Sequence, residues 1–261
     1  MKTVVVTGAA SGLGKAIANH YAKLNYHIII ADIQDEAGQT AVNEIVNAGG
    51  KADYFHCDIS KIDDFSALVN FTEHTTGQCN ILVNNAGVAA SGTLLESSEE
   101  EWQRLIELDL MSCVRGAKAF IPLLKKSASE GSPNAIANVA SFAGVALMPG
   151  MMTYNVAKAG VIAFSETLRC ELKRDNIHVA AACPSFFKTN LTSSMISSDP
   201  ATIKRVEGWM EKSSLTAESV AKDIADGLND KLSLIFSDKS MKKTYGRITW
   251  FYYKFMRKLL R

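Results

Sequence analysis

A glycine-rich turn near the N-terminus constrains the fold of this chain more than any other feature. Residues 7–14 (TGAASGLG) follow a short β-branched run at 3–6 and open an amphipathic segment at 13–24. Glycines let the backbone turn sharply and approach a pyrophosphate closely, and a helix N-terminus offers free N–H groups and the positive end of the helix dipole. A strand, a glycine turn and a helix in that order predict a phosphate-binding site.

An acidic residue about twenty positions further on makes such a motif more specific, because it holds the ribose hydroxyls of a dinucleotide. Here the apolar, strand-like run 27–31 is followed by Asp32. A carboxylate at this position also repels a 2′-phosphate, and Ser11, Ile33 and Gln34 supply no arginine to bind one. The sequence therefore predicts a dinucleotide site that favours NAD(H) over NADP(H).

Strand-like and helix-like segments alternate along the rest of the chain. Strands are predicted at 52–57, 80–83, 134–139, 177–183 and 232–236, and helices at 36–47, 62–75, 99–126 and 154–173. This alternation implies right-handed βαβ crossovers, so we expect an α/β fold with a doubly wound parallel sheet. We predict one dinucleotide-binding catalytic domain at 1–238, with a substrate lid at about 185–214.

Composition argues against several classes of protein, among them nucleic-acid-binding, disulfide-linked and membrane-spanning proteins. The chain has 261 residues, 47% of them hydrophobic, which is enough to bury a large core. A net charge of +1 argues against nucleic-acid binding dominated by phosphate contacts. The five cysteines have no disulfide or metal-site spacing, and no apolar run is long enough for a signal peptide or a membrane span. We expect a cytoplasmic protein without a metal.

Tyr154 and Lys158 are four residues apart in a predicted helix, so they share one helix face. A free tyrosine ionises near pH 10, but a neighbouring ammonium stabilises the phenolate and lowers its pKa. Ser141, thirteen residues before Tyr154 at the end of a strand, is placed to hydrogen-bond a substrate oxygen. This set suits proton transfer at an alcohol oxygen, although the tyrosine–lysine spacing alone arises by chance for about one tyrosine in fifteen.

Together, the motifs resemble those of the short-chain dehydrogenase/reductase family over about residues 1–238. They occur in the family's order: the glycine turn, Asp32, Cys57-Asp58-Ile59, Asn84-Asn85-Ala86-Gly87, Ser141 and the Tyr154/Lys158 pair. The resemblance implies a Rossmann-type sheet of about seven strands, in the order 3-2-1-4-5-6-7. It also implies hydride transfer between NAD(H) and an alcohol or carbonyl, and a homodimer or homotetramer.

By this resemblance Tyr154 is the general acid/base, Lys158 lowers its pKa and holds the nicotinamide ribose, and Ser141 orients the substrate oxygen. Asp58 contacts the adenine, and Asn84 with the residues after it braces the central sheet. The implied cofactor-binding residues are Gly8, Ser11, Gly12, Leu13, Gly14, Asp32, Asp58, Ile59, Asn85, Ala86, Gly87, Tyr154, Lys158, Pro184, Phe187 and Thr189.

Two positions depart from the family pattern. Asp109 stands where an asparagine usually completes the catalytic set, and we retain it as a catalytic candidate because the side chain is nearly isosteric. An ionised Asp109 would attract Lys158 and weaken its action on Tyr154; the alternative is that Asp109 only caps or kinks its helix. Ser185 follows Pro184 where the family usually has glycine, which predicts a shifted loop beside the nicotinamide.

The substrate wall is expected around Ser141, before Tyr154 and after Pro184. These stretches offer Ser141, Met148, Met151 and Phe186 as substrate contacts, and further apolar residues at Phe142, Leu147, Met152, Phe187, Leu191, Met195, Trp209 and Met210. Such a lining suits an apolar secondary alcohol or ketone, lipid-like or steroid-like molecules included. Between 141 and 154 there is no Arg, Lys or His to pair with a substrate carboxylate. Alternatively, several of these residues pack the lid onto the body or fill a subunit interface.

The C-terminal tail, 239–261, is a second region of interest. From 242 to 261 it has seven basic residues and no acidic one, and its apolar and basic residues separate at helical spacing. An amphipathic helix of this kind makes peripheral contact with an anionic membrane, packs on a neighbouring subunit or covers the active site. For the whole chain, the alternative to an oxidoreductase is a catalytically weak, NAD-binding sensor or scaffold.

Overall fold

The computed structural model describes residues 1–128, 134–187, 195–197 and 200–238 of the chain. The predicted amphipathic tail at 239–261 lies outside the described residues, as do Thr189 and Leu191 of the predicted site. No helix of the described part is long and apolar enough to cross a membrane.

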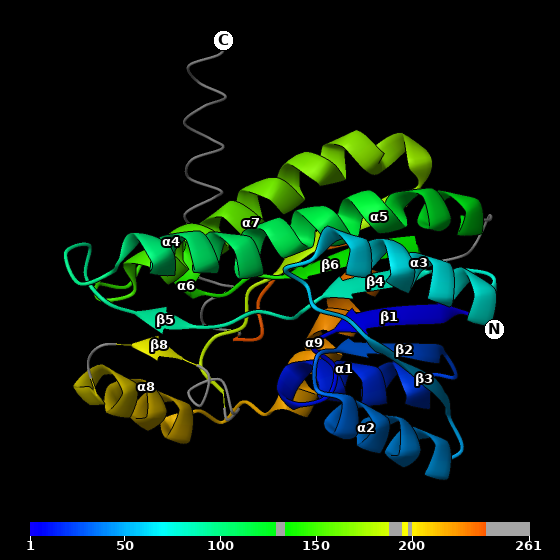
Figure 1. Cartoon of the computed structure of the whole chain (residues 1–261), viewed down its shortest axis with the longest axis horizontal. Helices are drawn as coiled ribbons and strands as arrows, with labels where there is room; N and C mark the ends of the chain where they lie inside the picture. The colour runs from blue at the N-terminus through cyan, green and yellow to red at the C-terminus, as the bar shows by residue number, and fades with distance from the viewer. Residues whose placement is uncertain (129–133, 188–194, 198–199, 239–261) are drawn as a thin grey trace.

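The centre of the molecule is a parallel sheet of seven strands in the order β3-β2-β1-β4-β6-β7-β9 (Figure 1). Counted along the chain, these strands have the order 3-2-1-4-5-6-7, so the predicted Rossmann-type topology is confirmed. The strands are β1 (Thr3–Thr7), β2 (His27–Asp32), β3 (Lys51–His56), β4 (Ile81–Asn84), β6 (Asn134–Val139), β7 (Ile177–Ala182) and β9 (Leu234–Ile235).

Helices cover both faces of this sheet, with α3, α5 and α7 on one side and α1, α2 and α9 on the other (Figure 1). Successive side chains of a strand point to opposite faces, so Val4 and Val6 pack towards α1 while Val5 packs towards α5. Complete burial of a large side chain such as Phe120 contributes about 1.5–3 kcal/mol. The helices are α1 (Gly12–Lys23), α2 (Asp35–Asn47), α3 (Ile62–Thr76), α5 (Ser112–Ser127), α7 (Met152–Glu171) and α9 (Ala217–Asn229).

The predicted helix at 99–126 consists of three consecutive elements. Helix α4 (Glu99–Leu105) begins after Ser98, whose side chain accepts a hydrogen bond from the Glu101 N–H. A π-helical segment, η1 (Ile106–Met111), then leads into α5. A π-turn widens the helix and re-aims the side chains within it, and such turns are frequent at functional sites. Asp109 lies in this wide turn, so the helix changes geometry at the residue that departs from the family pattern.

A second, two-stranded sheet connects the predicted lid segment to the body. Its strands are β5 (Ala90–Ser91) and β8 (Ile196–Ser197), which pair in parallel, and the Ile196 N–H donates to the Ala89 carbonyl at 2.9 Å. Helix α8 (Pro200–Lys212) follows β8 within the predicted lid, and a short helix, α6 (Ala143–Ala146), follows β6. These short elements bring Met195 and α8 towards the carboxyl ends of the main sheet (Figure 1).

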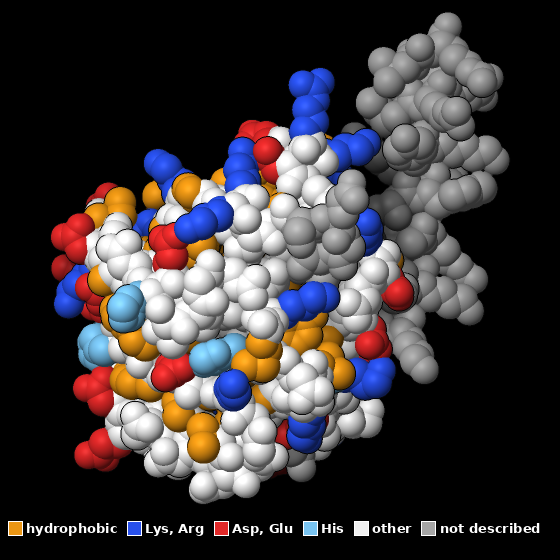
Figure 2. All heavy atoms as spheres, turned by 90° about the vertical axis from the view of Figure 1, so that its right-hand side faces the viewer, with side chains coloured by type: hydrophobic (Ala, Val, Ile, Leu, Met, Phe, Trp, Pro, Cys, Tyr) orange, Lys and Arg blue, Asp and Glu red, His pale blue; other side chains and the backbone are white. Residues whose placement is uncertain are grey.

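The side of the molecule on which the N-terminus lies has a mixed surface. Acidic, basic and apolar side chains of the described residues are interspersed over it (Figure 2). This agrees with the nearly neutral composition of the chain. The cavity described next lies at the other ends of the strands.

Candidate active site

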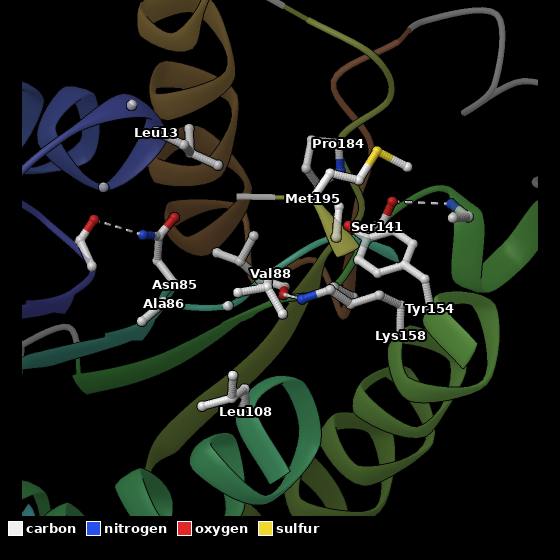
Figure 3. Close-up of a pocket in the computed structure, with 18 of the residues that line it drawn as sticks. Leu13, Asn85, Ala86, Val88, Leu108, Ser141, Tyr154, Lys158, Pro184 and Met195 are labelled. Carbon is white, nitrogen blue, oxygen red and sulfur yellow. Dashed lines mark hydrogen bonds between the residues drawn. The ribbon is translucent and has the colours of Figure 1, made fainter. Parts of the chain in front are cut away.

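A cavity of about 650 Å³ opens at the carboxyl ends of the central strands (Figure 3). Ligands of open α/β sheets bind in this place, outside the carboxyl ends of the strands. Every predicted cofactor residue of the described part lines it: Gly8, Ser11, Gly12, Leu13, Gly14, Asp32, Asp58, Ile59, Asn85, Ala86, Gly87, Tyr154, Lys158, Pro184 and Phe187. The fold thus gathers residues that are up to 179 positions apart, from Gly8 to Phe187, into one cavity.

The glycine turn leaves the start of α1 open towards this cavity. Gly8 has φ of +66°, and a Cβ on Gly14 would lie 2.1 Å from the Gly8 carbonyl oxygen. The first turn of α1 contains no acidic residue, and the side chain of Ser11 makes no capping hydrogen bond. The free N–H groups and the positive helix end are therefore available to an anion.

Asp32 is held at the end of β2 by backbone groups. Its Oδ2 accepts a hydrogen bond from the Ala10 N–H at 2.9 Å, and its Oδ1 accepts one from the Gln34 N–H at 3.0 Å. Asp58 accepts from both the hydroxyl and the N–H of Ser60, and these hydrogen bonds hold its pKa below the ordinary value. Both carboxylates are therefore held in fixed positions in the lining of the cavity.

The asparagines after β4 join neighbouring strands. Thr7 Oγ1 accepts from the N–H groups of Asn85 and Ala86, at 3.0 and 3.1 Å, and Asn85 Nδ2 donates to the Thr7 carbonyl at 2.9 Å. The register of β4 with β6 sets Asn84 opposite Asn138, and their amides hydrogen-bond at 2.8 Å. These bonds fix the carboxyl ends of β1, β4 and β6 to one another beside the cavity.

Tyr154 and Lys158 extend from α7 into the cavity, with Ser141 beside them (Figure 3). Both side chains belong to buried residues, and Lys158 Nζ lies 5.6 Å from the centre of the Tyr154 ring. Lys158 Nζ also donates to the Val139 carbonyl at 3.1 Å, and Ser141 Oγ accepts from the Ala143 N–H at 3.1 Å. Strand β6 and its following turn therefore set the positions of both partners of the tyrosine.

The Asp109 carboxylate is completely buried between two groups of the site. Oδ1 accepts from the Val88 N–H at 2.8 Å, and Oδ2 lies 3.3 Å from Lys158 Nζ. Oδ2 has no hydrogen-bond partner within the described residues, so the contact with Lys158 is an ion pair without good hydrogen-bond geometry. Gly87 makes room for it, because a Cβ there would lie 2.7 Å from Oδ1. Asp109 therefore does more than kink its helix.

These neighbours change the ionisation of the buried pair. Burial disfavours the ammonium of Lys158, but the Asp109 carboxylate and the Tyr154 phenol hold its pKa above the ordinary value. Burial also raises the pKa of Asp109, against the opposing effects of Lys158 and the Val88 N–H. The pKa of Tyr154 is raised by burial and by Asp109, while Lys158 and a hydrogen bond with Ser141 oppose the rise. Asp109 thus works against the effect of Lys158 on the tyrosine.

The comparisons with known proteins identify the family. The model of the family described as short chain dehydrogenase matches residues 2–199. A 3-oxoacyl-(acyl-carrier-protein) reductase of Chlamydia trachomatis is 37% identical over 197 residues, which cover 74% of this chain and 77% of the relative. The chain belongs to the short-chain dehydrogenase/reductase family. Members of this family are oxidoreductases that bind nicotinamide cofactors.

Solved structures have the same fold. A short-chain dehydrogenase/reductase from Burkholderia phymatum, in complex with NAD, matches with a TM-score of 0.86 at 27% identity over 93% of this chain and 91% of the other. A short-chain dehydrogenase from Sphingobium yanoikuyae, in complex with NADPH, matches with a TM-score of 0.81 at 22% identity over 98% and 95%. The two neighbours hold different cofactors, so cofactor preference has to be argued from this chain's own residues.

The other end of the cavity of this short-chain dehydrogenase/reductase is largely apolar. Seven of the predicted apolar wall residues line it: Phe142, Met148, Met151, Phe186, Phe187, Met195 and Met210. Three others, Leu147, Met152 and Trp209, do not line the cavity, and they are 59%, 40% and 37% exposed. The Trp209 ring instead packs against Phe186 in a tilted arrangement, with 5.0 Å between ring centroids. Ser185 lines the cavity too, in a loop that is tied to the Ser141 turn by the Phe142 N–H, which donates to the Pro184 carbonyl at 2.9 Å.

Residues outside the expected stretches complete this end. Arg104 and Leu108 reach it from α4 and η1, and Val206 reaches it from α8. Arg104 and Leu108 are four residues apart and so share a helix face. The family pattern at Asp109 indicates that this helix borders the site. Its neighbours Arg104 and Leu108 could have been found from that signal, whereas the expected wall began at residue 141.

Proposed function

We propose that this protein transfers a hydride between NAD(H) and an apolar secondary alcohol or its ketone. The observation that carries the proposal is one cavity with a phosphate-binding turn at one end, an apolar wall at the other, and the buried Tyr154/Lys158 pair between them. Binding of the cofactor and of an apolar molecule in one cavity brings the reacting carbon close to the proton-transfer group.

The residues present fit a nicotinamide dinucleotide. The space beside Gly14 is too small for a Cβ, and the open start of α1 suits the pyrophosphate. Asp32 supports NAD(H), because its fixed carboxylate is suited to ribose hydroxyls and repels a 2′-phosphate, and Ile33 and Gln34 beside it are uncharged. When bound, the nicotinamide ring supplies or accepts the hydride.

The chain's own residues handle the proton. Tyr154 donates its phenolic proton to the carbonyl oxygen of a ketone, or accepts the hydroxyl proton of an alcohol in the reverse direction. Ser141 holds that oxygen by a hydrogen bond, and the Lys158 ammonium stabilises the phenolate. Asp109 stabilises the charge of Lys158 and thereby moderates this effect.

The apolar wall supports a ketone on a sizeable hydrocarbon. Met148, Met151 and Met210 supply flexible, polarizable side chains that adapt to the shape of a ligand. The Chlamydia trachomatis relative is a 3-oxoacyl-(acyl-carrier-protein) reductase, an enzyme named for an oxo group on an acyl chain. We extend that chemistry to this chain as part of the proposal, since its wall has the same apolar character that an acyl chain requires.

Titration of the full chain with NADH and NADPH, followed by turnover of a panel of hydrophobic ketones and alcohols, tests the proposal. Tyr154→Phe is expected to lower kcat by about a thousandfold, because it removes the proton donor. Its affinity for NADH should stay within about threefold, since it removes a single hydroxyl. Tyr26→Phe removes a hydroxyl outside the cavity lining and should change neither value.

Equal turnover by Tyr154→Phe and the unaltered protein would contradict the assigned chemistry. Tight NADH binding without turnover of any panel member would instead favour the sensor or scaffold. A preference for NADPH would show that Asp32 does not set the cofactor.

A homodimer or homotetramer remains part of this proposal. It is supported by Val156 and Met152, which leave large apolar side chains 44% and 40% exposed on α7. Light scattering on the full chain measures the assembly, and a monomer at micromolar concentration would contradict it.

Vesicle flotation of the full chain against one ending at Asp238 tests membrane contact of the tail.

A further inference from the structure

Arg104 stands out at the apolar end of the cavity. It lies on α4, is exposed, and lines the cavity together with Leu108, one helical turn further on. Among the described lining residues the only other basic side chain is Lys158, whose charge is paired with Asp109. The acidic lining residues, Asp32 and Asp58, belong to the dinucleotide end. Arg104 is therefore a cation beside an apolar wall.

Two acidic groups next to Arg104 on its helix face, Glu101 and Glu107, have other partners, and Glu100 forms no ion pair with Arg104 within the described residues. Glu101 Oε1 accepts a hydrogen bond from Thr153 Oγ1 at 2.9 Å, and Glu107 pairs with Arg115. Within the described residues no carboxylate lies within 4.0 Å of the Arg104 guanidinium, whereas pairs such as Arg169–Glu166 do reach that distance. The guanidinium is therefore available to an anion that enters the cavity.

Helix α4 is anchored beside the proton-transfer group. The hydrogen bond from Thr153 to Glu101 holds α4 to the residue immediately before Tyr154. Leu105 is fully buried in the same apolar cluster as Met151 and Tyr154. Arg104 lies between these two anchors on the helix, so its backbone position relative to Tyr154 is set by packing.

We propose that Arg104 binds an anionic group at the distal end of the substrate, so that the preferred substrates are amphipathic anions. They carry a ketone or secondary hydroxyl at Tyr154, an apolar chain along the methionine wall, and a carboxylate or phosphate at Arg104. A guanidinium binds either group through two parallel hydrogen bonds. This inference rests on the proposed function and names the class of substrate for it.

Matched substrates test it in the full chain. An oxo fatty acid of medium length and its methyl ester have the same ketone and differ in one charge. The unaltered protein should use the acid with a kcat/KM about tenfold higher than the ester, as expected for one charged hydrogen-bonded pair. Arg104→Gln should lose this preference by losing activity on the acid alone, and Arg104→Lys should retain part of it. Lys118→Gln, which removes an exposed lysine of α5 outside the cavity lining, should keep the full preference.

A third substrate with a terminal phosphate monoester in place of the carboxylate distinguishes the two anions. Equal use of acid and ester by the unaltered protein, or an equal loss on both in Arg104→Gln, would overturn the inference. Failure of the proposed function is distinguishable, because calorimetric binding of the saturated fatty acid and its ester needs no turnover. Weaker binding of the acid alone in Arg104→Gln supports the role of Arg104, and unchanged binding overturns it.

Discussion

The two ends of the cavity are formed by different kinds of groups. At the dinucleotide end, backbone groups and short polar side chains at the strand ends hold one another, as in the hydrogen bonds of Asp32 to the N–H groups of Ala10 and Gln34. At the substrate end, longer side chains from α4, α8 and two loops form the wall, among them Met148 and Met210. The first end is defined by backbone geometry, and the second by the size and charge of individual side chains.

This difference predicts how each end responds to substitution. A change in the backbone-built end moves atoms that cannot relax, so it should affect cofactor binding and folding together. A change in the wall should alter the choice of substrate and leave the cofactor in place. The variants below test this contrast, from the largest expected effect to the smallest.

Gly14→Ala should have the largest effect. Its Cβ would lie 2.1 Å from the Gly8 carbonyl oxygen, so the turn has to move. We expect a loss of NADH affinity of at least about a hundredfold, and a decrease in the free energy of unfolding of about 1–3 kcal/mol. Fluorescence titration and thermal unfolding measure both quantities.

The matched control is Gly208→Ala on α8, where nothing lies within 4 Å of an added Cβ. It should be neutral, or stabilise by up to about 1 kcal/mol, because alanine favours a helix interior. Normal NADH binding by Gly14→Ala would mean that the turn is not the phosphate site.

Asp32→Asn should change the choice of cofactor. An amide accepts fewer hydrogen bonds from ribose hydroxyls and no longer repels a 2′-phosphate. We expect NADH to bind about tenfold more weakly and NADPH about tenfold more tightly, as measured by titration of both. Glu36→Gln, at an exposed position of α2 outside the cavity lining, should leave both affinities unchanged. Retention of the full NADH preference by Asp32→Asn would place the discrimination elsewhere.

Met148→Ala and Met152→Ala compare a methionine of the cavity wall with a nearby methionine outside it. Met148 lines the cavity and Met152 does not. Truncation of Met148 should lower kcat/KM for small apolar ketones several-fold, by about the effect of one or two methylenes in a pocket, with NADH affinity unchanged. Met152→Ala should leave kcat/KM unaltered. Identical profiles of the two variants on a ketone panel would show that Met148 does not contact the substrate.

The same contrast explains what could be predicted from the sequence. The strand ends and the glycine turn depend on local residue types at fixed spacing, so Asp32, Asn85 and the Tyr154/Lys158 pair could be assigned to one site in advance. Parallel topology then followed from the alternation of strands and helices.

The wall could not be predicted in the same way, because its residues depend on packing. The two-residue strands β5 and β8 are too short to give a periodic pattern, yet they bring Met195 to the site. The π-turn at Ile106–Met111 has no glycine or proline to mark it. Arg104 lies before residue 140, on a helix whose contribution to the cavity becomes visible only once α4 is packed against α7.

The proton chemistry of Tyr154, Lys158 and Asp109 has one direct test, the pH dependence of kcat/KM for alcohol oxidation in the unaltered protein and in Asp109→Asn. Oxidation needs the Tyr154 phenolate, so activity increases as pH rises through its pKa. The groups that face Lys158 are Asp109 from η1, Cys113 from α5 and Tyr154 from α7. Asp109 raises the pKa of Tyr154, so removal of its charge should move the midpoint to lower pH.

Asp53→Asn removes a carboxylate outside the cavity lining and should leave the midpoint where it is. A lower midpoint in Asp109→Asn alone is the predicted result. An unchanged or higher midpoint would contradict the assignment of Asp109 as the group that opposes Lys158 at the tyrosine.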